Sequence, residues 1–553
     1  MDRQPSTTAR SRLTAAASRL GTALAARVEI DRRALAAFRI GLGVLLIVDL
    51  LARSRSLTAF YTDGGVLPSR AFFADYSTLR SVHAFVGEPW AVGLLFAVAA
   101  VFALALTVGY RTRLATVVSW LLLLSLHTRN PMVLNAGDSL LLMLLFWSVF
   151  LPLGARWSVD AVRRADAPAG ADSDADVDST TGDTDSASRS PSGPAVATVA
   201  TMAVLVQVLA MYATNAVHKY ESELWMSGDA IAYIMQADQF TYLLGNHLAE
   251  FHGLLRAFSL LWIGLLFASP LLLLLRGLPR AAVASLFVGM HLGMAATIRI
   301  GLFPLVVVVA FIPFYQTPVW DLAERGIARL DRSGSRTRWR ARFVSAARRF
   351  LAVTGAFPRP AVNGRGLRSH VERLSAGVAR GRVLVTTVVP YVFLVLIVLS
   401  SAQAVGYADT PEPGEEVLEA VEMDQSWRMF APDPLHTTRW YVVPGTLEDG
   451  SEWDVFRDAA VDYERPAQVE TTYPSARWRK YLSNVYSADN EKHRSYFANY
   501  LCDDWNRTHD TSVEQLTVTQ SYERTIPGND TVEAANEFDL ITYDCSGPLV
   551  QND

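Results

Sequence analysis

The sequence predicts an all-α polytopic membrane bundle of about nine transmembrane helices, followed by a small extracytoplasmic β-rich C-terminal domain. Hydrophobic residues make up 51% of the 553 residues, and most of them are gathered in long runs. Arginines are concentrated in two of the segments outside those runs, as is typical of cytoplasmic segments of membrane proteins. The final segment, residues 407–553, differs from the rest because it holds 29 acidic residues against 11 arginines and lysines.

Each predicted span is an apolar run that could cross, or nearly cross, a hydrocarbon core about 30 Å thick. The third, fourth and eighth runs are short. No cleavable signal peptide is evident, because residues 1–33 contain no long apolar run. The runs lie at residues 34–51, 91–108, 114–128, 139–153, 195–214, 258–276, 281–297, 300–316 and 383–403.

Arginine placement predicts the orientation of these spans. Residues 1–33 contain seven arginines, and residues 323–382 contain fifteen against three acidic residues, so both segments are expected in the cytoplasm. This places the protein in the cell membrane as a multi-pass protein with its C-terminus outside. The expected organisation is a cytoplasmic N-terminal segment at 1–33, a transmembrane domain at 34–317, a basic cytoplasmic loop at 318–382, a final transmembrane helix at 383–403 and an extracytoplasmic domain at 407–553.

Two segments between the spans have biased compositions. Residues 165–194 are rich in Asp, Ser, Thr, Ala, Gly and Pro, and this composition predicts a disordered acidic insertion, with metal or partner binding as the alternative. The arginine-rich loop 318–382 is expected to fix the topology, and it could also form amphipathic helices on anionic lipid. Nucleic-acid binding is not expected of a loop tethered to a membrane.

The C-terminal segment carries signals of an oxidising compartment. Both cysteines, Cys502 and Cys545, lie there, so a disulfide between them is plausible. Two glycosylation sequons begin at Asn506 and Asn529. Alternating residues in 514–522 predict a strand. The acidic exterior and the scarcity of lysine resemble the composition of a halophile or the product of a GC-rich genome.

Lys219 is the sole lysine among the first 479 residues, in a chain with 47 arginines and three lysines. A lysine can lose its proton when it is partly buried and then act as a base, whereas an arginine cannot. Lys219 lies just past the predicted span 195–214. The sequence therefore raises the hypothesis that its amine has a chemical role.

Several other polar residues are expected at the same depth, near the outer ends of the spans. Ionisable groups at membrane depth usually face one another or a cavity, so we expect a polar pocket in the outer half of the bundle. No zinc spacing, phosphate-binding loop or dinucleotide fingerprint is present, and no metal site is expected. The candidate residues are His127, Asn135, Asp138, His218, Lys219, Glu221, His291 and Arg299.

Each candidate also has a purely structural interpretation. Lys219 could extend to the membrane surface as an anchor, or form an ion pair with Glu223 four residues on. His291 could be a core histidine bonded to a backbone carbonyl. Capping of the fourth span is an alternative for Asn135 and Asp138, and interfacial anchoring is one for Arg299.

Five stretches together resemble the HTTM domain, the membrane domain shared with vitamin K-dependent γ-carboxylases. The resemblance covers roughly residues 30–310 and 385–460. The similar stretches are AAFRIGLG at 36–43, FYTDGGVLP at 60–68, VHKYESE at 217–223 with WMSG at 225–228, MHL at 290–292 followed by IGLFP at 300–304, and DQSWRMFAP at 424–432.

The resemblance implies roles for particular residues. Lys219 occupies the position of the family's catalytic base, with Glu221 and Glu223 as the accompanying acids, and His291 corresponds to a histidine that precedes the IGLFP run. In the carboxylases the lysine is thought to deprotonate a reduced vitamin K hydroquinone, which reacts with oxygen and becomes an epoxide while a glutamate captures carbon dioxide. The implied cofactor is thus vitamin K hydroquinone or menaquinol, with O2 and CO2 as co-substrates.

The chain departs from the carboxylase pattern in two places. Animal carboxylases carry a histidine after the asparagine that corresponds to Asn135, but Ala136 follows here. The C-terminal segment is also short for a carboxylase, which puts a protein or peptide glutamate acceptor in doubt. His127 or His218 could replace the missing histidine.

Three hypotheses follow. The leading one is a carboxylase-like, hydroquinone-dependent membrane enzyme with Lys219 as base and His291 in support. The alternative is a non-enzymatic module that binds quinone or lipid and presents an extracytoplasmic interaction domain. Transport is the weakest, because the sequence shows neither repeated halves nor paired broken helices.

Overall fold

The computed structural model describes residues 6–76, 81–167, 193–331, 335–355, 384–487, 490–527 and 531–551. The predicted disordered insertion at 165–194 lies almost entirely outside the described residues. The last part of the basic loop and the sequon at Asn529 also lie outside them.

The larger part of the chain is a helical bundle. Short helices and 3-10 turns connect the long helices, and β1 (Ile30–Asp31) pairs with β2 (Ala195–Val196) as a small antiparallel ribbon. The helices are α1 (Ser6–Val28), α2 (Arg32–Ser54), α3 (Leu57–Tyr61), α4 (Ser69–Asp75), α5 (Pro89–Val108), α6 (Thr112–Arg129), α7 (Ala136–Ser148), α8 (Val159–Ala165), α9 (Val199–Tyr220), α10 (Glu223–Ser227), α11 (Ala230–Gln236), α12 (Leu244–Leu248), α13 (His252–Phe267), α14 (Leu271–Leu274), α15 (Gly277–Thr297), α16 (Phe303–Phe311), α17 (Thr317–Leu330), α18 (Ser335–Gly355), α20 (Val389–Ala404) and α21 (Glu412–Ala420).

Five helices among the described residues are long and apolar enough to cross a membrane: α2, α5, α9, α15 and Thr386–Ala404. A sixth candidate is the pair Phe303–Phe314 and Thr317–Arg329, which is bent by 102°. Each of the other predicted spans coincides with a helix, but α7 and α13 are shorter than a membrane requires. The several apolar helices fit a multi-pass membrane protein, and the count of nine stays a prediction.

Helix α7 forms the centre of the bundle. It has 13 residues, about 20 Å at 1.5 Å per residue, and every residue from Gly137 to Ser148 except Ser139 is buried. A helix that is apolar on all sides is expected inside a protein or in lipid, and here α2, α6, α9 and α16 surround it. Its length is therefore set by the surrounding protein.

The C-terminal part combines a sheet with two helices, α22 (Ala476–Val485) and α23 (Glu491–Thr508). The long strand β6 pairs with β3 and β4 along one edge and with β7 along the other, and all of these pairings are antiparallel. A disulfide joins Cys502 of α23 to Cys545 after β7. The small β-rich domain predicted from the sequence is thus a mixed α and β unit. Its strands are β3 (Thr437–Val442), β4 (Pro444–Leu447), β5 (Glu452–Asp454), β6 (Val513–Thr525) and β7 (Val532–Asp544).

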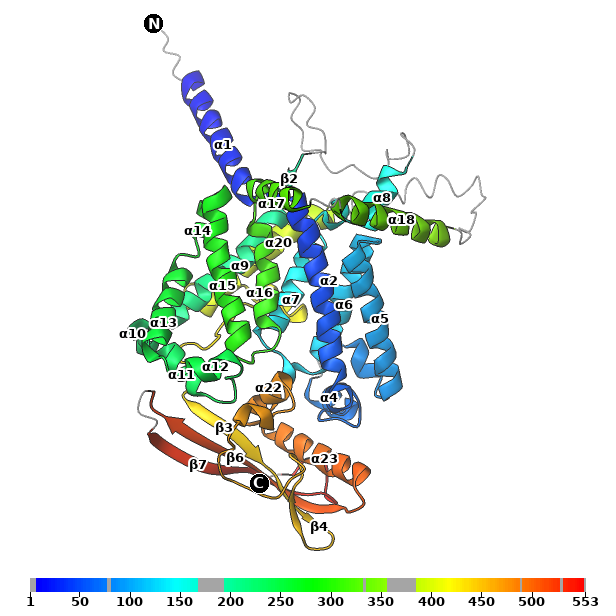
Figure 1. The fold of residues 1–553 in the computed structure, drawn as a ribbon, viewed down its shortest axis with the longest axis vertical. Coiled ribbons are helices and arrows are strands. Elements are labelled where there is room, and N and C mark those ends of the chain that lie inside the picture. Colours follow the sequence, from blue (N-terminus) through cyan, green and yellow to red (C-terminus); the bar gives the residue numbers. More distant parts are fainter. Residues whose placement is uncertain are drawn as a thin grey trace.

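The basic and acidic parts of the chain lie at opposite ends of the molecule. Helices α1, α17 and α18 lie at one end of the bundle, and the C-terminal sheet lies at the other, with α22 between sheet and bundle (Figure 1). This separation agrees with the sidedness predicted from arginine placement. The assignment of the two ends to the cytoplasm and the exterior stays a prediction.

A connecting segment after the last span returns into the bundle. We call residues 422–435 the return segment. Its Met423 and Trp427 are buried in the same core as the helices of the bundle. Gln425 accepts a hydrogen bond from Gln207 Nε2 of α9 at 2.7 Å and one from Trp427 Nε1 at 2.6 Å. The bundle core therefore extends past residue 407, where the sequence analysis placed the start of a separate domain.

Candidate functional site

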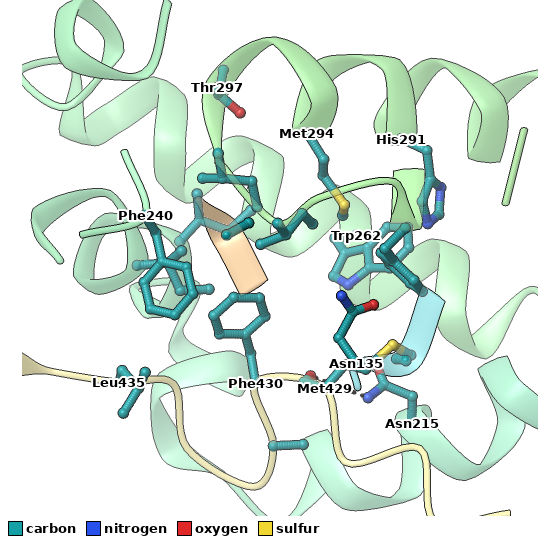
Figure 2. Close-up of a pocket in the computed structure, with 18 of the residues that line it drawn as sticks. Asn135, Asn215, Phe240, Trp262, His291, Met294, Thr297, Met429, Phe430 and Leu435 are labelled. Carbon is teal, nitrogen blue, oxygen red and sulfur yellow. Dashed lines mark hydrogen bonds between the residues drawn. The ribbon is translucent and has the colours of Figure 1, made fainter. Parts of the chain in front are cut away.

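A cavity of about 880 Å³ lies in the end of the bundle nearest the sheet. Helices α9, α11, α13 and α15 line it, and the return segment forms part of its wall. Figure 2 shows His291 and Trp262 at one side of this space, Phe240 and Leu435 at the other, and the ring of Phe430 between them. Its volume is within the range of small-molecule binding sites.

Lys219 lines this cavity from the last turn of α9. The predicted span 195–214 ended too early, because the helix continues through the polar residues to Tyr220. Lys219 is only 2% exposed, so it does not extend to water as a surface anchor. Its Nζ donates to the carbonyl oxygens of Met429 at 2.7 Å and Phe430 at 3.0 Å.

The aromatic ring of Trp225 completes the surroundings of the Lys219 amine. The ring centroid is 3.6 Å from Nζ, and the indole Nε1 donates to the same Phe430 carbonyl at 2.9 Å. No carboxylate among the described residues forms an ion pair with Lys219. The two backbone carbonyls and the face of the Trp225 ring thus contact this amine, where a carboxylate counter-ion would ordinarily lie.

Glu221 and Glu223 do not support Lys219 as the resemblance implied. Both carboxylate residues are exposed, and neither lines the cavity. The alternative ion pair between Lys219 and Glu223 is also wrong. The physical reason is that α9 ends at Tyr220, so the two acids follow a change of direction into α10 instead of continuing along the same helix face.

His291 lines the same cavity from α15 and is 1% exposed. Its Nδ1 donates to the Phe287 carbonyl at 2.8 Å, as the structural interpretation predicted. The other ring nitrogen, Nε2, lies 3.5 Å from the Tyr212 hydroxyl. The two interpretations of His291 are compatible, since the carbonyl bond orients the ring while Nε2 lies beside Tyr212, which also lines the cavity.

Asn135 reaches the cavity from the start of α7. Its Oδ1 accepts from Gly137 N, and Asp138 Oδ2 accepts from Asn135 N, so the two residues form the cap predicted for this helix. Neighbouring Asn215 on α9 donates to the carbonyls of Trp427 and Met429. Asn215 and Lys219 together attach the return segment to α9.

A second group of buried charges lies outside the cavity and includes one of the predicted residues, Asp138. Arg53 Nη2 contacts Asp138 Oδ1 at 2.6 Å, and Arg53 Nε contacts Asp49 Oδ2 at 2.6 Å. Arg477, from α22 of the C-terminal part, contacts Asp49 at 2.5 Å and Asp138 at 2.9 Å. We call Asp49, Arg53, Asp138 and Arg477 the ion-pair cluster.

His127 belongs to the surroundings of this cluster and not to the cavity. Its Nε2 is 3.2 Å from Arg53 Nη2, and its Nδ1 is 3.8 Å from a carboxylate oxygen of Glu422 in the return segment. Burial, together with the nearby carboxylates of Asp424 and Asp138, raises the pKa of Glu422 to about 7. The carboxyl of Glu422 is therefore the group here that titrates near neutral pH.

The remaining two predicted residues lie near the cavity without lining it. His218 is buried on α9, and its Nε2 has no hydrogen-bond partner among the described residues. Arg299 donates to the Glu470 carbonyl at 2.5 Å and so connects the bundle to the C-terminal part. Its observed contact is thus between the bundle and the C-terminal part, and the interfacial anchoring alternative stays a prediction. Asn506 is exposed near the end of α23, and its Oδ1 accepts from Val513 N.

Sequence reasoning missed the contribution of the C-terminal part to the cavity wall. Arg439 of β3 and Arg479 and Lys480 of α22 all line it. Burial lowers the pKa of Arg479 to about 10 and also lowers the pKa of Lys480. No signal in the sequence singled out these arginines, but Lys480 is one of only three lysines.

The chain matches no protein-family model, no curated protein and no solved structure. The resemblance to the HTTM domain therefore rests on the residues quoted above.

Proposed function

We propose that this protein is a hydroquinone-dependent, carboxylase-like enzyme of the membrane, with Lys219 as its base. The observation that carries the proposal is the position of Lys219, which is buried at a cavity of about 880 Å³ and has no carboxylate partner in the described part of the chain. A structural lysine at membrane depth would ordinarily be paired, because an unneutralised buried charge is costly.

The residues around the cavity fit a quinone. Apolar side chains that could contact a ring and the start of a prenyl chain include Trp262, Met290, Met294, Ile300 and Phe303. Lys219 and Asn135 provide polar groups on the same lining, and His291 with Tyr212 provides another pair. An apolar pocket with a few convergent polar groups is the usual form of a site for such a ligand.

The surroundings of Lys219 suit a base. A neutral amine has two N–H donors and one lone pair, and the Met429 and Phe430 carbonyls accept the two donors. The third position on Nζ can then take a phenolic proton, and the Trp225 ring lies where it would stabilise the resulting ammonium. His291, oriented by the Phe287 carbonyl, can hold a ligand oxygen through Nε2 or relay a proton with Tyr212.

A reduced quinone bound here would supply the proton and the electrons for reaction with oxygen, so that one hydroquinone and one O2 give one quinone epoxide and one water. The proposal takes vitamin K hydroquinone or menaquinol as the reduced quinone and CO2 as a further co-substrate, with a protein or peptide glutamate as acceptor. It places the enzyme in the cell membrane with nine spans, a cytoplasmic N-terminus and the sheet outside.

Epoxide formation by the purified full-length protein tests the proposal. The protein in lipid nanodiscs would receive menaquinol, oxygen and bicarbonate, and the products would be separated by chromatography. We expect epoxide from the wild-type protein and from Lys492→Ala, an exposed-lysine control, but none from Lys219→Ala. Equal epoxide from Lys219→Ala, with folding intact, would contradict the role of Lys219.

A non-enzymatic quinone or lipid module is the second candidate. It is favoured by the fact that the hydrogen bonds of Lys219 Nζ go to the return-segment carbonyls, which gives the lysine a purely structural role in holding that segment. This candidate predicts menaquinol binding without turnover, measured as retention of the quinol by wild-type protein that forms no epoxide.

A further inference from the structure

Three cations form one side of the cavity next to the C-terminal part. Arg439 lies on β3, Arg479 and Lys480 lie on α22, and all three line the cavity. Their contacts are with neutral groups. Arg439 Nε donates to the Thr437 hydroxyl, and Lys480 Nζ donates to Asn484 Oδ1.

Arg479 is the most constrained of the three. Its guanidinium carbon lies 3.7 Å from the centre of the Phe240 ring, and its Nη2 donates to the Arg299 carbonyl at 2.8 Å. Its Nε is buried and has no hydrogen-bond partner among the described residues. A buried donor without an acceptor is costly, and an anion beside the guanidinium would satisfy it.

The absence of carboxylate partners distinguishes these cations from others in the same acidic segment. Arg457 pairs with Asp454, and Arg465 pairs with Asp238 and Glu523. Within the described residues, none of the three cavity cations forms an ion pair. Two carboxylates also line the cavity, but Asp433 accepts a hydrogen bond from Ser222, and Asp424 pairs with no cation among the residues described.

Another part of the cavity wall is apolar and exposed at the outside of the bundle. Leu244 of α12 and Phe258 of α13 line the cavity while 57% and 37% of their surfaces are exposed. Leu243 and Phe251, which directly precede these two helices, and Leu254 of α13 are exposed as well. In a membrane protein such a surface is in contact with lipid chains, so an amphiphile could reach the cavity sideways from the bilayer.

We infer that this cavity binds the phosphate head group of an anionic membrane lipid through Arg439, Arg479 and Lys480, with the acyl chains on the side of Leu244 and Phe258. Arginine is well suited to this because its planar fork donates two parallel hydrogen bonds to a phosphate. Free inorganic phosphate offers the same head-group chemistry without the chains. The inference concerns the same cavity as the proposed function but rests on different residues, since it involves neither Lys219 nor any turnover.

Lipid retention by the full-length protein tests this inference. Protein in a neutral detergent would be mixed with dioleoylphosphatidic acid, with dioleoylphosphatidylcholine or with inorganic phosphate, and bound species would be counted by native mass spectrometry. The test variant is R439Q/K480Q, which leaves the Arg479 bond to the bundle intact. The control is R507Q, which removes an exposed arginine of α23 that pairs with Asp504.

We expect the wild-type protein and R507Q to retain phosphatidic acid in preference to phosphatidylcholine, and R439Q/K480Q to bind it about tenfold more weakly. Phosphate alone should displace the lipid only weakly, because it lacks the chains. Equal retention of the two lipids, or retention unaffected by R439Q/K480Q, would overturn the inference. Phosphate that competes as strongly as the lipid would also overturn it, because it would leave the apolar side without a role.

Discussion

The cavity and the ion-pair cluster are neighbouring sites in the same bundle, and they differ in the groups that contact their buried charges. In the cluster, Arg53 and Arg477 each contact both Asp49 and Asp138, so every charge has partners. At the cavity, Lys219 and Arg479 contact carbonyls and aromatic rings instead. A fully paired cluster joins two parts of a protein, whereas unpaired cations beside a cavity remain available to a ligand.

The largest expected effect comes from breaking the cluster. Asp138→Ala should lower the free energy of unfolding by about 3 to 5 kcal/mol, because it leaves two buried guanidinium groups with one carboxylate between them. Thermal and denaturant unfolding in detergent measure this. Asp504→Ala, which breaks an exposed pair, is the matched control and should change stability by less than about 1 kcal/mol. A similar small effect for both variants would mean that the cluster is not structural.

Removing the cavity lysine should cost less stability than breaking the cluster. Lys219→Met removes one donor from each of the Met429 and Phe430 carbonyls, which keep their bonds from Asn215 and Trp225. Because two hydrogen bonds are lost, we expect a loss of about 1 to 3 kcal/mol. Lys492→Met, at an exposed lysine, should be nearly neutral. Unfolding measured as above distinguishes the two. A loss larger than that of Asp138→Ala would make Lys219 primarily a structural residue and would reverse the comparison.

The return segment between the two sites should make stability depend on pH. The pKa of Glu422 is raised from 4.5 to about 7, so the folded state binds a proton more tightly than the unfolded state. This contribution is fully present below pH 4.5 and is lost as pH rises to about 7. Apparent unfolding midpoints should therefore fall across that window in the wild-type protein. A Glu422→Gln variant should show a flatter profile, and an unchanged profile would contradict the assignment.

The smallest effects are expected at the two acids that follow α9. Glu221→Gln and Glu223→Gln should each change stability by less than about 0.5 kcal/mol and leave quinol turnover unchanged, because both side chains are exposed and neither contacts Lys219. The epoxide assay and unfolding curves check this. A loss of turnover in either variant would show that the acids act on the cavity in a conformation other than this one.

Hydropathy alone predicted where the long apolar helices lie, because each of them coincides with an apolar run. It placed the end of α9 too early, since Asn215, His218 and Lys219 are polar but face protein and not water. Asp49 and Arg53, four residues apart at the end of an apolar run, are a sequence signal from which a buried ion pair could have been predicted.

The site itself depended on contacts that no local pattern encodes. Lys219 donates hydrogen bonds to carbonyls that lie 210 and 211 residues further along the chain. Asp138 forms an ion pair with Arg477, which is 339 residues away in the sequence. Arginine is so common in this sequence that neither Arg477 nor Arg479 stood out. The rarity of lysine, in contrast, identified a residue that lines the cavity.

The most direct test of the central claim is turnover by Lys219→Arg. Arginine can keep a positive charge over Trp225 and donate to the same carbonyls, but it cannot give up its proton at neutral pH. With wild-type protein and Lys219→Arg compared in nanodiscs at equal bound menaquinol, we predict that the variant binds the quinol and forms no epoxide. Epoxide formation by Lys219→Arg at the wild-type rate would contradict a titratable amine as the base and would leave Lys219 as the anchor of the return segment.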